Sequence, residues 1–403
     1  MPDVLIICPG QRDRLNLADE RIMERFGLRF AGTAIRPGFD PVAFVDQLSA
    51  GPAAVDGVFG SNDATAHLAF MVARRLGLPG PTPESFMLCH DKLAARRAQA
   101  AAVPEVTPRF AEIDIDDPEP GPPLPYPFFV KPVVGHLSQL AYTVASDAEL
   151  RSVVAEARER LGAITDHDRL LEGREFRRLV AEQLLSGRLV TFEGFMQGGR
   201  MTPVGVTDAV MHPNGISFLR FDYPSTLPQH VQRAMAEVAG RLMPALGFDD
   251  SLFNIEFFVA PDDRMWIVEA NGRMASQFAP LVQAVHGVST YEIGLAIAAG
   301  QPAELPPARP DMVASSFVLR TYRDAVVRVV PDPSAVSRHF GHSHVELLVR
   351  PGQRLSENDD DVASHRLAVV ALAGRDREEV LRRYEETLAL LPFQLDPIPA
   401  PVG

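Results

Sequence analysis

The sequence predicts an α/β protein built from two to three domains. Short apolar runs alternate with helical segments over residues 1–76, which is the pattern of a sheet covered by helices. A second series of apolar strands follows between residues 190 and 271 and predicts a second sheet. A length of 403 residues with 46% hydrophobic residues provides enough apolar material for several cores.

The first segment is predicted to be a small parallel sheet with helices packed on it. Its three short apolar runs have the length and composition of strands. They cover residues 4–8, 28–35 and 57–60. Apolar residues at helical spacing predict helices in the segments that follow each run. These helices are expected at residues 17–26, 41–48 and 64–76. Prolines interrupt residues 79–83, which we interpret as a linker.

The middle of the chain is predicted to hold a strand-helix-strand unit and then the second sheet. An alanine-rich helix with Lys92 in its first turns is expected to run to about Ala102, and an acidic, proline-rich loop covers residues 116–127. The strand-helix-strand unit spans residues 128–183, with its helix at 149–161. Strands of the second sheet are expected at residues 190–196, 202–208 and 215–221, followed by a helix at 230–246 and a hairpin at 253–271.

The C-terminal segment is predicted to be an α+β cap. It begins after a proline-rich stretch at residues 301–310. Strands are expected at residues 313–321, 326–330, 345–349 and 367–372, and an amphipathic helix at 377–391. No internal repeat is apparent.

Composition excludes several classes of partner. The net charge of −13 argues against nucleic acid, whose phosphates would be repelled. The N-terminus lacks the basic region of a signal peptide, and no apolar run is long enough to cross a bilayer. Cys8 and Cys89 are interpreted as small buried thiols rather than a disulfide or a metal pair. We therefore expect a cytoplasmic protein without nucleic-acid or membrane partners.

Lysine is the rarest cation in this chain. Only Lys92 and Lys131 occur among 39 basic residues, so arginine is used almost everywhere else. A lysine ammonium on its thin stem reaches a phosphate inside a pocket where the planar arginine fork does not fit. Lys131 ends the apolar run of residues 127–131, and Lys92 follows Asp91 at the start of a helix. The two lysines are therefore candidate phosphate contacts, with codon bias as the alternative explanation.

The predicted hairpin carries two glutamates that should face each other. If Asp262 and Asp263 form its turn, Glu256 and Glu269 fall opposite each other, with Cβ atoms roughly 5 Å apart. Opposed carboxylates on an otherwise apolar hairpin are destabilising unless a cation lies between them, and oxygen ligands select a hard cation such as Mg²⁺. Asn271 can add a carbonyl oxygen, and Arg273 brings a charge suited to a transferring phosphoryl group.

These features together resemble the ATP-grasp superfamily, over roughly residues 1–390. The matching segments are, in order, Asp91-Lys92, Phe129-Val-Lys131-Pro, Val180-Ala-Glu182-Gln-Leu-Leu-Ser-Gly187, and Glu256 with Glu269-Ala-Asn271-Gly-Arg273. The earlier segments Gly60-Ser-Asn-Asp, Leu76-Gly-Leu-Pro-Gly-Pro-Thr-Pro-Glu and His90-Asp-Lys resemble the carboxylate-amine ligase branch that contains the L-amino-acid (dipeptide) ligases and biotin carboxylase.

The resemblance implies the ATP-grasp fold. An N-terminal parallel α/β (pre-ATP-grasp) domain is expected at residues 1–88, and a C-terminal α+β cap at 311–403. The central nucleotide-binding lobes are expected at residues 89–300, with a lid subdomain at about 128–183 that can hinge over nucleotide.

The resemblance also implies an activity, an ADP-forming ligase that joins a small carboxylate to an amine through an acyl phosphate. It assigns ATP binding to Lys92, Lys131, Ser138, Glu182, Gln183, Leu185 and Glu193. It assigns Mg²⁺ or Mn²⁺ to Glu256, Glu269 and Asn271, and catalysis to Arg273. Glu193 enters this set because Arg188-Leu189 stands where relatives often place the ribose-binding carboxylate. Ser138 enters because the segment Gly135-His-Leu-Ser-Gln-Leu is poorer in glycine than the usual phosphate loop.

The substrate pocket is expected after the catalytic motif and near the loop around residue 212. Its candidate residues are His136, His212, Ser276 and Gln277. A homodimer is one open assembly. Two alternatives stay open: a biotin-carboxylase-like ATP-dependent carboxylation, disfavoured because no lysine is left to carry biotin, and a non-catalytic nucleotide-binding protein, disfavoured because the metal set is complete.

Overall fold

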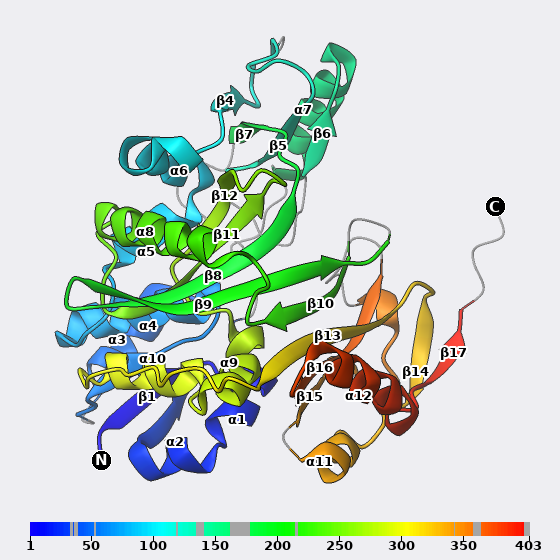
Figure 1. Ribbon diagram of the computed structural model, residues 1–403. Helices are drawn as coiled ribbons and strands as arrows, with labels where there is room; N and C mark the ends of the chain where they lie inside the picture. The colour runs from blue at the N-terminus through cyan, green and yellow to red at the C-terminus, as the bar shows by residue number, and fades with distance from the viewer. Residues whose placement is uncertain are drawn as a thin grey trace. The chain divides into compact units, whose positions relative to one another are not determined.

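The computed structural model describes residues 1–32, 35, 39–51, 54–117, 120–133, 141–161, 178–213, 217–341, 343–357 and 364–398 (Figure 1). Its contacts divide the chain into two compact units. The first unit consists of residues 1–205, 227–276 and 291–304, and the second of residues 206–226, 277–290 and 305–403. The three-domain division expected from the sequence stays a prediction.

The first unit begins with the predicted parallel sheet. Its strands are β1 (Asp3–Ile7), β2 (Gly27–Ala31) and β3 (Gly57–Phe59), in the order β2-β1-β3 and all parallel. Its helices are α1 (Gln11–Leu17), α2 (Glu20–Arg25), α3 (Pro41–Ser49) and α4 (Asp63–Leu76). The helix expected at 17–26 corresponds to α2, which begins only at Glu20 because the Asp19 side chain accepts the Arg21 amide and caps it there. The separate helix α1 was not predicted.

Two helices follow the parallel sheet, α5 (Pro83–His90) and α6 (Lys92–Ala102). The predicted linker therefore ends at Pro83, which occupies the first turn of α5 behind a Thr82 cap. Asp91 ends α5 and caps α6, because its carboxylate accepts the amides of Leu93 and Ala94. Lys92 is thus the first residue of α6, which agrees with the prediction that it lies in the first turns of a helix.

A small antiparallel sheet forms the next part of the first unit. Its strands are β4 (Phe110–Asp114), β5 (Phe128–Pro132), β6 (Tyr142–Val144) and β7 (Arg178–Gln183), in the order β4-β7-β5-β6. The single-turn helix η1 (Pro104–Val106) precedes it, and α7 (Asp147–Leu161) lies beside it in Figure 1. The side chains of Leu150, Val154 and Ala157 share a core with the strands. The sequence predicted β5, α7 and β7 but not β4 or β6.

The second sheet of the first unit is antiparallel. It consists of β8 (Arg188–Gln197), β11 (Ser251–Val259), β12 (Met265–Asn271) and the start of β9 (Arg200–Met211), in the order β12-β11-β8-β9. Helix α8 (Gln229–Ala245) packs against β8, and α10 (Thr290–Ala298) completes the unit. The prediction of a β11–β12 hairpin is confirmed.

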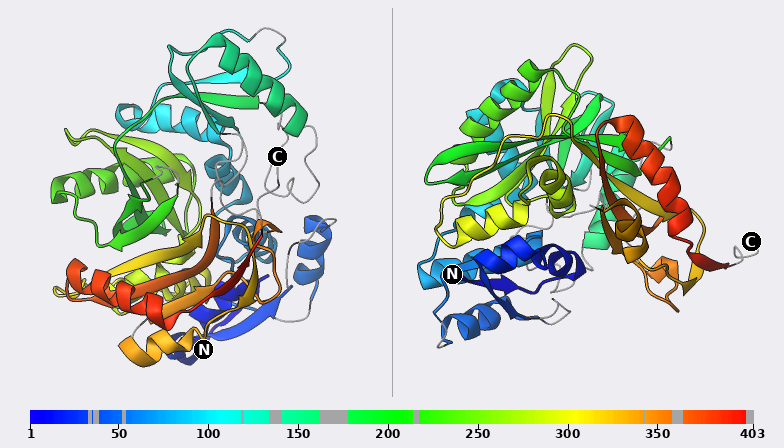
Figure 2. Two further views of the ribbon diagram at one scale, coloured as in Figure 1. Left: turned by 90° about the vertical axis from the view of Figure 1, so that its right-hand side faces the viewer. Right: turned by 60° about the horizontal axis from the view of Figure 1, so that its bottom comes forward.

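The second unit contains the rest of β9 with the strands β10 (Phe218–Tyr223), β13 (Val313–Thr321), β16 (His365–Gly374) and β15 (Ser343–Leu347), in the order β9-β10-β13-β16-β15. Strands β14 (Ala325–Val329) and β17 (Gln394–Pro397) form a separate pair. Its helices are α9 (Ala279–His286), α11 (Ser334–Phe340) and α12 (Arg377–Leu390). Figure 2 shows α12 along the sheet, where Tyr384 stacks on Phe317 with ring centroids 3.9 Å apart. The predicted α+β character of this segment is confirmed.

Two further predictions can be compared with the described residues. Cys8 and Cys89 are both buried free thiols, as expected. Within the described ranges, no helix combines the length and hydropathy that a membrane-spanning helix requires.

Candidate functional site

The β11–β12 hairpin brings the two predicted glutamates face to face. Glu256 and Glu269 are direct cross-strand partners, and Asn254 and Asn271 form another pair of the same ladder. Their strand neighbours Ile255 and Phe257 are fully buried. The predicted opposition of the two carboxylates is therefore confirmed, and it occurs on an otherwise apolar hairpin.

The two carboxylates differ in their electrostatics. Burial raises the pKa of Glu256 to about 7, and the charge of Glu269 contributes to the same shift. Burial also acts to raise the pKa of Glu269, but the charges of Lys92 and Lys131 outweigh it and leave that pKa below its ordinary value. The Lys92 ammonium lies 3.7 Å from a Glu269 oxygen. Glu269 therefore ionises more readily than Glu256, and the repulsion between the two carboxylates raises the pKa of Glu256.

Lys131 and Glu182 form a second charged group beside this pair. The Lys131 Nζ lies 3.0 Å from Glu182 Oε2, and Arg96 Nε donates to Glu182 Oε1 at 2.8 Å. Burial acts to raise the pKa of Glu182, but the Arg96 and Lys131 charges outweigh it and lower that pKa to about 2. Burial lowers the pKa of Lys131 against the attraction of Glu182. The Glu182 carboxylate, predicted to take part in ATP binding, therefore holds Lys131.

Arg96 is a residue that the sequence analysis missed. It is 2% exposed and also donates to Gln99 Oε1 at 2.5 Å and to the Val268 carbonyl at 2.7 Å. The sequence did contain a signal, because Lys92, Arg96 and Gln99 share one face of an otherwise alanine-rich helix. A polar face on such a helix indicates buried partners.

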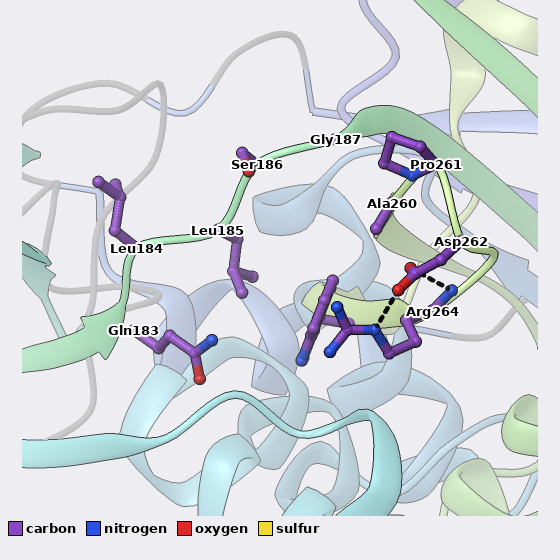
Figure 3. Close-up of a pocket in the computed structure, with 10 residues that line it drawn as sticks. Gln183, Leu184, Leu185, Ser186, Gly187, Ala260, Pro261, Asp262 and Arg264 are labelled. Carbon is purple, nitrogen blue, oxygen red and sulfur yellow. Dashed lines mark hydrogen bonds and ion pairs between the residues drawn. The ribbon is translucent and has the colours of Figure 1, made fainter.

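A cavity of about 560 Å³ lies between the segment after β7 and the β11–β12 turn (Figure 3). It is lined by Gln183, Leu184, Leu185, Ser186, Gly187, Ala260, Pro261, Asp262, Arg264 and Trp266. Arg264 donates to Asp262 at 2.7 Å and lies over the Trp266 ring, 5.5 Å from its centroid. The predicted Gln183 and Leu185 are thus in the lining. A volume of this size suits a small-molecule ligand.

Arg273 is held from three directions. Its Nε and Nη2 lie 2.9 and 3.3 Å from the two carboxylate oxygens of Asp63, and Nη1 donates to the Met274 carbonyl at 3.4 Å. The Asn254 side-chain amide donates to the Arg273 carbonyl at 2.8 Å. The preceding residue must be Gly272, because a Cβ there would lie 2.8 Å from the Phe248 ring. Asp63 and Asn254 were not predicted.

Asn254 also orients Asn271. The Asn271 Nδ2 donates to Asn254 Oδ1 at 3.1 Å. With this nitrogen engaged, the carbonyl oxygen is the Asn271 atom that can bind a cation. Asn254 is 2% exposed and stands two residues before Glu256 in an apolar strand. An asparagine in an apolar strand, two residues before Glu256, is the sequence signal that could have identified Asn254 as a site residue.

The hairpin is therefore suited to a hard cation. Among the residues described, no group of three His, Cys, Asp or Glu side chains has the geometry of a metal site. The donors present are two facing carboxylates and one amide oxygen, a set that Mg²⁺ or Mn²⁺ accepts when other oxygens complete the coordination. Nearby, the buried Lys131 and the partly buried Lys92 are cations that can meet an anionic ligand.

Glu193 lies on β8 at the other side of this hairpin. It is 1% exposed, its Oε1 accepts the Ala275 amide at 3.2 Å, and its Oε2 has no hydrogen-bond partner among the described residues. Burial raises its pKa to about 8. The structure therefore places Glu193 against the loop that follows Arg273, and its contact with ribose stays a prediction.

The predicted substrate residues are distributed over both units. In the first unit, Ser276 accepts a hydrogen bond from Arg12 Nη1 at 3.4 Å. In the second, Gln277 donates to Ser316 Oγ at 3.0 Å, and the His212 ring lies beside Tyr322 with centroids 5.1 Å apart. The predicted His136 and Ser138 lie outside the described residues. The roles of all these residues stay predictions.

Comparison with known proteins identifies the architecture. Residues 124–280 match the family model described as the ATP-grasp domain. An uncharacterized protein, y4rH, from Sinorhizobium fredii is 28% identical over 295 residues, which make up 72% of this chain and 58% of that protein. The chain thus matches less than two thirds of the length of this curated relative.

Solved structures share the fold at low sequence identity. L-amino acid ligase from Bacillus licheniformis superposes with a TM-score of 0.79 at 18% identity, covering 98% of each chain. Biotin carboxylase from Campylobacter jejuni gives 0.69 at 15% identity, covering 98% of this chain and 92% of that one. Phosphoribosylglycinamide synthetase from Anaerococcus prevotii gives 0.68 at 12% identity, covering 98% and 100%. At these identities the likeness establishes the fold.

Proposed function

The chain carries an ATP-grasp domain, and from that premise we propose that it is an ATP-dependent carboxylate-amine ligase. The reaction joins a small carboxylic acid to an amine and releases ADP and phosphate. The observation that carries this proposal is the set of groups around the β11–β12 hairpin. Two opposed carboxylates, the buried Lys131, the partly buried Lys92 and an arginine fixed by Asp63 lie on or beside this hairpin, and the turn of the same hairpin lines the cavity.

The nucleotide is proposed to bind in the cavity between the segment after β7 and the β11–β12 turn. Gln183 and Leu185 would contact the base through the chain segment that lines this cavity. Lys92 and Lys131 would meet the phosphates, because a compact ammonium neutralises a phosphate oxygen without filling the pocket. Ser138 and Glu193 remain proposed contacts to the phosphates and the ribose.

Glu256, Glu269 and the Asn271 carbonyl oxygen are proposed to hold Mg²⁺ or Mn²⁺. When bound, the metal neutralises phosphate charge and orients the γ-phosphoryl group. The protein contributes fixed ligands: Asn254 holds the Asn271 amide, and the ladder holds the two carboxylates opposite each other. Because these side chains are already oriented, they need to move little when the metal binds.

Chemistry is proposed to proceed through an acyl phosphate. A carboxylate oxygen of the substrate bonds to the γ-phosphorus as the bond to ADP breaks. The amine then bonds to the carbonyl carbon, phosphate leaves, and the amine loses a proton. Arg273 would stabilise the charge on the transferring phosphoryl group and on the tetrahedral intermediate. No side chain is needed as a nucleophile, because positioning and electrostatics account for catalysis.

The acid and the amine are proposed to be small metabolites. We propose an amino acid as the carboxylic acid, since this chain shares its fold with an L-amino acid ligase. His136, His212, Ser276 and Gln277 are the proposed substrate contacts. Release of ADP should be measured against pooled amino acids, with and without Mg²⁺, and a parallel arm should contain bicarbonate and biotin. Turnover in the second arm alone would replace the proposal with carboxylation.

Isotope transfer tests the intermediate. With an ¹⁸O-labelled carboxylate, the proposal requires that one labelled oxygen appears in the released phosphate. Label in AMP, or label retained entirely in the acid and the amide, would rule out an acyl phosphate. ATP binding without any turnover in either arm would instead support a non-catalytic nucleotide-binding protein.

A further inference from the structure

We propose that Asp63 is a positioning residue that holds the Arg273 guanidinium in its reactive orientation. This inference rests on the proposed function for its catalytic consequence. Its structural basis is the two-point contact in which Arg273 Nε and Nη2 meet Asp63 Oδ1 and Oδ2 at 2.9 and 3.3 Å. Paired contacts of this kind fix the plane of a guanidinium as well as its position.

The contacts leave Arg273 with capacity for a ligand. A guanidinium has five N–H groups. Two of them face Asp63 and a third faces the Met274 carbonyl. Each terminal nitrogen therefore retains one N–H beyond the contacts with the described residues. The Arg273 side chain is 23% exposed, so these remaining donors are not sealed in the core. A group held in this way stabilises developing charge without first having to reorient.

Asp63 is itself fixed by the parallel sheet. It is the first residue of α4, directly after the Asn62 cap, whose side chain accepts the Thr65 amide. The partial positive charge at the start of this helix favours an ionised carboxylate. Gly60 permits the tight entry into the helix, because a Cβ there would lie 2.2 Å from the Thr65 carbonyl oxygen. The position of Asp63 is therefore set by β3 and α4, independently of the hairpin.

The contact also separates Arg273 from the proposed metal ligands. Glu269 and Glu256 both attract the Arg273 charge, as does Asp63. Without Asp63, those two carboxylates remain as anionic partners near the guanidinium. It would turn toward them and compete with the cation for their oxygens. Asp63 thus keeps the arginine charge and the metal-binding oxygens apart, although it is 210 residues away in the chain.

The first test measures the kinetic effect of Asp63→Asn, which preserves size and removes charge. The expected result is a fall in kcat of tenfold or more and a rise in the Mg²⁺ concentration needed for half-maximal rate. The ATP dissociation constant, read from Trp266 fluorescence, should stay within twofold. Asp46→Asn is the matched control, because Asp46 pairs with Arg75 at the far end of α4 at 2.9 Å. It should leave all three quantities unchanged.

The second test separates a positioning role from an independent one. Asp63→Ala, Arg273→Ala and the double variant form a cycle in kcat. If Asp63 acts through Arg273, the double variant is no slower than Arg273→Ala alone. Multiplicative losses, or a kcat of Asp63→Asn within twofold of wild type, would overturn the inference.

A third measurement does not require that the proposed function is correct. The same cycle, followed by urea unfolding, measures the coupling between the two side chains directly. The double variant should be less destabilised than the sum of the two single variants, because each single variant leaves one charge without its partner. If the losses in the free energy of unfolding are additive, Asp63 and Arg273 do not interact and the inference is wrong. Coupling in this cycle together with a wild-type protein that forms no amide would refute the ligase proposal and leave the contact established.

Discussion

Glu256 and Glu269 occupy directly opposed positions of the β11–β12 ladder, although like charges at such positions repel each other. The repulsion is visible in the raised pKa of Glu256, which burial and Glu269 bring to about 7. A pair of this kind destabilises the metal-free protein and becomes favourable when a cation binds between the two carboxylates.

Glu256→Gln should therefore abolish most metal-dependent turnover without lowering the thermal stability of the metal-free protein. We expect kcat to fall by roughly two orders of magnitude, because one ligand charge is lost. Thermal melting in EDTA should give a midpoint equal to or above that of wild type. Glu156→Gln, which alters a surface pair with Arg160 at 3.0 Å, is the control for removal of a glutamate charge. An earlier melt of Glu256→Gln in EDTA would contradict the repulsion argument.

Lys131→Arg should weaken ATP binding about as much as Lys131→Ala. The residues around Lys131 and Glu182 enclose only about 10 Å³, which is no more than a single water requires. The larger guanidinium cannot be accommodated there and would displace its neighbours. Titration of Trp266, the only tryptophan in the chain, reports binding at the cavity that it lines. Arg97→Lys, at a residue whose side chain is 61% exposed, serves as the control. Normal ATP binding by Lys131→Arg would leave codon bias as the explanation for the two lysines.

Glu182→Gln should destabilise the protein near neutral pH and lose its effect in acid. The carboxylate pairs with two buried cations, which depress its pKa from 4.5 to about 2 although burial opposes this shift. A depressed pKa contributes stability that is complete above 4.5 and disappears as the pH falls through about 2. We expect a loss of roughly 3–5 kcal/mol in the free energy of unfolding at pH 7.

Urea unfolding of both proteins at pH 7, 4.5 and 3 provides the measurement. The difference between wild type and Glu182→Gln should be similar at the first two values and smaller at pH 3. A difference that does not change with pH would show that the carboxylate is not ionised against Arg96 and Lys131.

Asn254→Ala should reduce affinity for the metal although Asn254 is not itself a proposed ligand. Its amide orients Asn271 and holds the Arg273 backbone. Loss of such an outer contact typically weakens metal binding by about 10- to 100-fold. The Mg²⁺ concentration for half-maximal ADP release should rise accordingly, while Trp266 still reports nucleotide binding. An unchanged Mg²⁺ requirement would exclude this role.

The sequence by itself determined the elements whose evidence is local. Apolar runs and turn residues predicted the parallel sheet and the hairpin. Glu256 and Glu269 were also paired correctly, but the register next to the turn would place Val268 opposite Glu256, and a shift between Glu256 and Phe257 brings Glu269 there instead. The N-terminal position of Lys92 followed from its neighbour Asp91. Short segments such as β4 and β6 were missed, because strands of this kind form only when a partner supplies their hydrogen bonds.

Tertiary structure alone decided which distant groups meet. No local pattern connects Glu182 to Arg96, or Asp63 to Arg273, since these pairs are separated by 86 and 210 residues. Charged side chains are costly to bury without partners, so their final contacts depend on which elements the whole fold brings together. The sequence therefore identified most of the chemical groups of the site, whereas the packing of the first unit decided which of them hold one another in place.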